Sequence, residues 1–170
     1  MPVAIWLTLA ASFAASYCDV RTRRIPNWLT GSLVVAAIVV HAFAGIHSLA
    51  ESLAVMALLT AAGTVVYALG GIGGGDIKLG IAACGMLGFP LCIPFLLYTA
   101  IGGGLLAIVF IVSRGKVRET ASRVMLTTMG GSRGVVASKG ETLPYAVAFA
   151  FGAIFIVLSQ SVAPFLRITV

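Results

Sequence analysis

A run of three glycines followed by an acid and a base, Gly-Gly-Gly-Asp-Ile-Lys at residues 73–78, is the part of this chain best suited to chemistry. Its flanks are almost wholly apolar, and a carboxylate at or below a bilayer surface costs several kcal/mol unless it is solvated or paired. The glycines remove side chains and let another backbone come close to Asp76. This combination indicates chemistry on a peptide at the edge of a membrane, provided that a second acid lies nearby.

The second acid is found by elimination, because the chain has only five acidic residues: Asp19, Glu51, Asp76, Glu119 and Glu141. Glu51 falls in a connection that we place on the outer side of the membrane. Glu119 lies four residues before Arg123, where an i,i+4 ion pair explains it, and Glu141 suits the start of a helix. Asp19 and Asp76 remain, at the end of the first apolar run and the start of the fourth, on the same side of the membrane.

Two neighbouring carboxyl groups support one kind of catalysis. They cannot both ionise easily, and when they share a proton they activate a water molecule and protonate the departing group. We therefore expect Asp19 and Asp76 to act as an aspartic protease pair that titrates as one unit. No cofactor or metal is expected, because the three cysteines form no C-x-x-C pair and indicate neither a zinc site nor a disulfide framework.

The composition identifies the solvent of this chain. Hydrophobic residues make up 60% of its 170 positions and charged residues only 9%, which is typical of a membrane protein. We expect an all-α polytopic fold with about six transmembrane helices in a single integral membrane domain over residues 1–170. The net charge of +6 does not indicate nucleic acid, because the basic residues lie between apolar runs. Membrane lipids are the expected surroundings.

The apolar runs place the expected helices. They lie at about residues 3–18, 28–46, 52–70, 77–90, 91–112 and 143–163. The fourth is short, since about 14 residues rise only about 21 Å against a hydrocarbon core of about 30 Å. Pro90 is the predicted break before the fifth. No basic residue precedes the first run, so we interpret it as a membrane helix rather than a cleavable signal.

Basic residues divide the connections into two kinds. Arg or Lys follows the first, third and fifth apolar runs, whereas the second and fourth connections carry none. The positive-inside rule makes the three basic connections cytoplasmic, including the loop 113–142, and places both termini outside. Apolar residues recur every three or four positions from Val117 to Met129, which predicts a helix on the membrane surface. The rest of this loop is either a flap or a tether, and both interpretations stay open.

Three segments together resemble a known family. Residues 19–27 (DVRTRRIPN), 73–78 (GGGDIK) and 143–146 (LPYA) are similar, in order and spacing, to the type IV prepilin peptidases, which are G-x-G-D intramembrane aspartyl proteases. The resemblance implies that Asp19 and Asp76 are the catalytic pair and that the substrate is a pilin or pseudopilin precursor. It also implies cleavage at the cytoplasmic side of the bacterial inner membrane, between a basic leader ending in glycine and an apolar helix.

The chain also departs from the larger members of that family. Those members carry a cytoplasmic segment with paired C-x-x-C motifs and methylate the new N-terminus of the product. This chain has a short connection there and no C-x-x-C. It therefore resembles the compact, peptidase-only branch of tight-adherence (Flp) pilus systems, and N-methyltransferase activity is not expected.

Several neighbours of the two acids are candidates for supporting roles, each with a simpler alternative. Gly73 and Gly75 either permit a tight backbone beside the acid and pair with an extended substrate, or serve helix packing. Lys78 either stabilises the ionised acid or marks a cytoplasmic boundary, and we favour the boundary. Pro144 and Tyr145 either line the active site at the start of the last helix or anchor it at the interface.

Two other classes of function fit part of the pattern. A small transporter or channel component would place acids near the bilayer midplane and contain pairs of broken helices, whereas the acids here gather at one face. A pilus-assembly scaffold would tolerate the loss of both aspartates. The peptidase interpretation predicts that the loss of either aspartate abolishes function.

Overall fold

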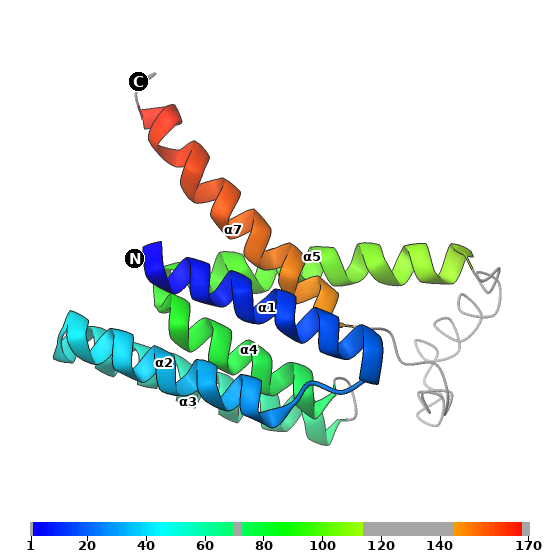
Figure 1. Ribbon diagram of the computed structural model, residues 1–170, viewed down its shortest axis with the longest axis horizontal. Coiled ribbons are helices and arrows are strands. Elements are labelled where there is room, and N and C mark those ends of the chain that lie inside the picture. The colour runs from blue at the N-terminus through cyan, green and yellow to red at the C-terminus, as the bar shows by residue number, and fades with distance from the viewer. Residues whose placement is uncertain (1, 70–72, 114–144, 168–170) are drawn as a thin grey trace.

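The chain folds into a bundle of helices (Figure 1). The computed structural model describes residues 2–69, 73–113 and 145–167, and these segments contain helices and no strand. In chain order the helices are α1 (Pro2–Thr22), α2 (Asn27–Ala44), α3 (Ile46–Ala68), α4 (Gly74–Leu87), α5 (Phe89–Ser113) and α7 (Ala146–Arg167). The predicted all-α fold is confirmed, and each apolar run of the sequence forms one of these helices.

Four of these helices, α1, α2, α3 and α5, are long and apolar enough to cross a membrane. The helix α4 has 14 residues, as short as the sequence predicts, and the shorter apolar part of α7 covers Ala146–Ser161. The chain is therefore a multi-pass membrane protein. Most of the loop 113–142, with the surface helix predicted in it, lies outside the described residues.

Two breaks between helices differ from the predicted ones. The helix α3 begins earlier than predicted, at Ile46, because Gly45 adopts a φ of 120° and ends α2 abruptly. The break before α5 lies at Gly88, with a φ of 74°, and the prediction of a break at Pro90 was wrong. The N–H of Gly88 donates to the carbonyl of Cys84 at 3.0 Å, so a glycine ends α4. Pro90 instead falls in the first turn of α5, where a missing N–H leaves no helical hydrogen bond unmade.

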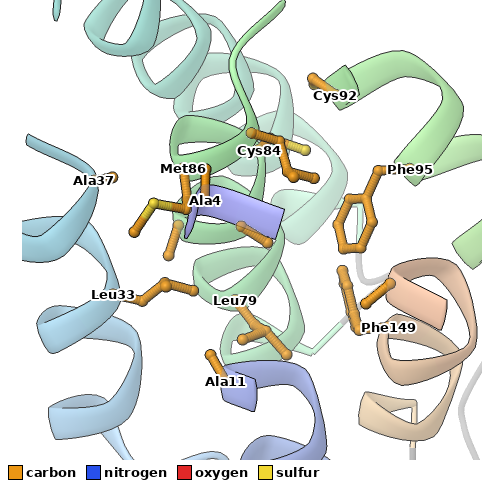
Figure 2. Packing of buried hydrophobic residues seen from close by; sticks show 14 of the residues in the cluster. Ala4, Ala11, Leu33, Ala37, Leu79, Cys84, Met86, Cys92, Phe95 and Phe149 are labelled. Carbon is orange, nitrogen blue, oxygen red and sulfur yellow. The ribbon is translucent and has the colours of Figure 1, made fainter. Parts of the chain in front are cut away.

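The short helix α4 lies at the centre of the bundle. It packs against α1, α2, α3 and α5, and between Leu79 and Leu87 every residue except Ile81 is buried. Figure 2 shows side chains of α1, α2, α5 and α7 gathered around it, with Phe95 and Phe149 facing each other at a ring-centroid distance of 6.1 Å. This buried stretch carries only apolar residues, because a helical segment packed on nearly all sides has no face left for polar side chains.

Polar side chains of α2 and α3 fix the C-terminal end of α4. Ser52 Oγ donates to the carbonyl of Gly85 at 2.7 Å, and His41 Nε2 donates to the carbonyl of Met86 at 3.1 Å. These carbonyls need outside partners, because a helix leaves its last four carbonyls without intrahelical bonds. Met56 of α3 fills the space that a side chain on Gly85 would take. Close packing and hydrogen bonds therefore hold α4 at one depth, and with it the acid at its other end.

Candidate active site

Asp19 lies in the last turn of α1, which continues to Thr22, beyond its predicted end near residue 18. Its side chain is buried, with 9% of its surface exposed. The Oδ2 atom accepts the backbone N–H of Ala146, the first residue of α7, at 3.3 Å. Figure 1 shows the last turn of α1 beside the first turn of α7. The first candidate acid therefore sits where one helix ends and another begins.

The start of α7 is a suitable partner for a carboxylate. The first N–H groups of a helix lack intrahelical acceptors, and the helix dipole places about half a positive charge there. Ser16, which lies on the same face of α1 as Asp19, donates its Oγ to the carbonyl of Ala146 at 2.8 Å. Side chains of α1 therefore hold both backbone polar groups of Ala146, and the geometry of Asp19 depends on how α7 docks.

Asp76 lies in the first turn of α4 and is half-buried. Its backbone N–H donates to the carbonyl of Gly73 at 3.1 Å, and a Cβ on Gly73 would lie 3.0 Å from Asp76 Oδ2. A side chain at this glycine would therefore crowd the carboxylate. A Cβ on Gly75 would lie 3.4 Å from Ile25, in the segment that joins α1 to α2. Both glycines thus let other groups approach the start of α4 closely.

The two acids are close enough to influence each other. Burial at the start of α4, together with the negative charge of Asp19, raises the pKa of Asp76 from 3.8 to about 6. Burial is the larger cause, because it removes water from the charged form, and the neighbouring carboxylate adds repulsion. The structure therefore brings Asp19 and Asp76 to one end of the bundle, in different surroundings.

The other predicted site residues fall in different places. Lys78 is exposed, and its Nζ donates to Asn27 Oδ1 at 3.1 Å, which links α4 to the start of α2. Tyr145 precedes α7, is 44% exposed and lines the same cavity as Asp76. Pro144 lies outside the described residues. The contact of Lys78 fits the boundary interpretation better than a role on the acid.

Of the remaining acids, the structure describes only Glu51, because the acids at 119 and 141 lie outside the described residues. Glu51 is in α3 and not in a connection as predicted, and its Oε1 accepts the N–H of Phe89 at 2.9 Å. It therefore caps α5 at the end of α4 opposite to Asp76. Within residues 2–69, 73–113 and 145–167, no group of three His, Cys, Asp or Glu side chains is placed to hold a metal ion.

A cavity of about 620 Å³ opens beside Asp76. Its walls come from α3, α4, α5 and α7, and almost every lining side chain other than Asp76, Thr99 and Tyr145 is apolar. Sequence reasoning did not find this cavity, nor the contacts of Ser16 and Ala146. The one available signal was the spacing of Ser16 and Asp19, three residues apart on a helix and hence on one face.

The comparisons with known proteins cover the part of the chain that carries both acids. Residues 6–108 match the sequence pattern of a family described as the type IV leader peptidase family. The match runs from α1 into α5 and includes Asp19 and Asp76. The chain matches no curated protein and no solved structure.

Proposed function

The chain belongs to the type IV leader peptidase family, and from this premise we propose that it removes the leader from pilin or pseudopilin precursors. The bond cut joins a basic leader, ending in glycine, to an apolar helix. The proposed site faces the cytoplasm at the bacterial inner membrane, because the positive-inside rule places the basic connections on the cytoplasmic side. The same rule places both termini of the chain outside.

The observation that carries this proposal is the convergence of two carboxyl groups in unlike surroundings. Asp19 accepts an N–H at the start of α7, whereas burial and repulsion raise the pKa of Asp76 to about 6. Pairs of acids whose surroundings favour opposite protonation states divide into a base and an acid. We assign Asp19 as the general base and Asp76, whose pKa is raised, as the general acid that holds the shared proton in the active form.

The proposed reaction uses one water molecule. The Asp19 carboxylate takes a proton from the water while the water oxygen attacks the scissile carbonyl carbon. At the same time, the Asp76 carboxyl gives its proton to the carbonyl oxygen of the substrate. A tetrahedral diol results. One diol hydroxyl then returns a proton to Asp76, the proton on Asp19 passes to the leaving nitrogen, and the C–N bond breaks. Both aspartates regain their starting states, and no covalent intermediate forms.

The short connection between α1 and α2 supports a peptidase without methyltransferase activity. Four residues, Arg23 to Pro26, join the two helices, and they contain no cysteine. The larger bifunctional relatives named above carry their C-x-x-C segment at this point. We therefore propose that the new N-terminus leaves this protein unmethylated.

The test is cleavage of a precursor by purified protein in lipid vesicles, with products identified by mass spectrometry. We expect Asp19→Asn and Asp76→Asn each to lower the rate at least about a thousandfold, since both steps need proton transfer. Glu51→Gln is the matched control, because it neutralises an acid that caps α5 and keeps an acceptor oxygen. Retained cleavage by either aspartate variant would contradict the mechanism.

A further inference from the structure

The cavity beside Asp76 is an elongated apolar space along one side of the bundle. On α5 its lining runs from Leu96 to Ala107, which at about 1.5 Å per residue is about 16 Å. Asp76 and Tyr145 lie in its wall, at the starts of α4 and α7. The cavity therefore connects the proposed site with an apolar wall along α5.

The α5 wall of this cavity is made of small residues. Ala100, Gly103, Gly104 and Ala107 recur at the spacing of one helix face and all line the cavity. A Cβ on Gly104 would meet nothing within 4 Å, so the space beside it is open. A lipid chain has little free energy to gain by filling this cavity, because the burial of apolar surface does not drive association inside a bilayer. Close backbone approach does favour helix pairing there, and small residues permit it.

The position of Asp76 limits what this cavity can receive. A peptide bond held at the two aspartates has chain on both sides of it, and the proposed substrate is basic on one side and apolar on the other. The basic leader needs water, whereas the apolar helix needs a space that is both apolar and in contact with the site. The cavity meets both conditions for the helix, because Asp76 is part of its lining.

We propose that the cavity between α3, α4, α5 and α7 is the docking groove for the first turns of the precursor's apolar helix, which packs against the face of α5 that carries Ala100, Gly104 and Ala107. This inference rests on the proposed function. A length of about 16 Å accommodates about three turns of a substrate helix. The groove thereby sets which bond reaches the aspartates, since a docked helix fixes the distance from its first turn to the site.

The first test narrows the groove and measures cleavage of a full-length precursor. Gly104→Leu places a side chain in open space, and Ala100→Leu enlarges an exposed neighbour on the same face. We expect each to lower kcat/KM at least about tenfold, mainly through KM, because a blocked hydrophobic contact weakens binding. Gly31→Leu on α2 is the matched control, since a Cβ there also meets nothing within 4 Å. If both groove variants cleave the precursor with the same kcat/KM as Gly31→Leu, the groove proposal is overturned.

A second test reads binding without cleavage. A precursor with a photoreactive residue in the first turns of its apolar helix is mixed with the Asp76→Asn variant and irradiated, and the crosslinked peptide is identified by mass spectrometry. We expect crosslinks to α5 between Ala100 and Ala107, which Gly104→Leu reduces. Crosslinks to the exposed face of α2, or to lipid alone, would overturn the proposal.

The two tests separate failure of the groove from failure of the proposed function. If the unmutated protein cleaves no precursor while the α5 crosslink forms, the peptidase proposal fails and the groove remains. If the unmutated protein cleaves the precursor while crosslinks avoid α5, the groove fails and the peptidase proposal remains.

Discussion

Neutralising Asp76 should stabilise the fold at neutral pH and leave it unchanged in acid. The pKa of this carboxyl is 3.8 in an unfolded chain and about 6 in the folded protein. The folded protein therefore holds the proton more tightly, and the stability that comes from this proton is complete below pH 3.8 and lost as the pH rises through about 6. Asp76→Asn removes this loss, because an amide does not ionise.

The magnitude follows from the same two pKa values. A rise from 3.8 to about 6 corresponds to about 3 kcal/mol between the charged and neutral forms. Asp76 is only half-buried, so water screens part of this energy and we expect about 1 kcal/mol to remain. For a chain of this length, that raises the unfolding midpoint by about 2–4 °C.

The assay is thermal unfolding in detergent or lipid nanodiscs between pH 4 and pH 8. We expect Asp76→Asn to exceed the unmutated protein by this margin at pH 8 and to match it at pH 4. In Asp19→Asn the pKa of Asp76 should fall below 6 but stay above 3.8, because burial is the larger cause of the shift. An Asp76→Asn variant that is less stable at pH 8, or a gain that is equal at both pH values, would refute this reasoning.

Three further predictions concern the docking of α7, the packing of α5 and the topology. Ser16→Ala removes the donor to the first carbonyl of α7 and should lower kcat about three- to tenfold, because the start of α7 then positions Asp19 less firmly. The free energy of unfolding should fall by about 1 kcal/mol, the contribution of one hydrogen bond. An unchanged kcat would show that this contact does not position the site. Gly152→Ala should destabilise the fold by at least about 1 kcal/mol, because its Cβ would meet a backbone carbonyl of α5 at 3.1 Å, whereas Gly31→Ala should be near neutral. The topology can be tested with single cysteines in a background without the native ones. His47→Cys should react with an impermeant thiol reagent added outside, and Arg24→Cys only with reagent on the cytoplasmic side. The reverse pattern would contradict the proposed orientation.

The helices and the candidate acids could both be predicted from the sequence, for different physical reasons. Apolar runs must cross a membrane as helices because lipid offers no hydrogen bonds to the backbone, so the runs predict their number and order. Asp19 and Asp76 could be identified because the chain has few acids, and the other three acids each have an explanation that does not involve catalysis. The helix ends were predicted less well, because a glycine such as Gly88 ends a helix only when it adopts a positive φ, and this depends on packing.

The contacts that complete the site were not open to sequence reasoning. Ser16 and Ala146 are separated by 130 positions, and no local spacing predicts that α1 and α7 meet there. The cavity depends on how four helices leave space between them, although two of the small α5 residues that line it, Gly103 and Gly104, stand in a run of three glycines in the sequence. From the sequence alone, a run of three glycines in an apolar helix indicates close helix packing. That interpretation fits Gly102, whose Cβ would meet Phe151, and not Gly104, which faces open space.

The proposed base acts on the water molecule and the proposed acid on the carbonyl oxygen in the same step, so their contributions to the rate cannot be independent. Removal of one member of a catalytic pair leaves the other without its function, and such losses are far from additive. A scaffold or transporter that carries the same acids for structural reasons has no such requirement. The energetic coupling between Asp19 and Asp76 therefore distinguishes these classes of function.

The most direct test of the proposed catalytic pair is precursor cleavage by Asp19→Asn, by Asp76→Asn and by the double variant, side by side in lipid vesicles. A shared catalytic pair predicts that the double variant loses no more activity than either single variant, while all three still bind the precursor. Losses that multiply in the double variant, or cleavage that survives in either single variant, would contradict a shared catalytic pair.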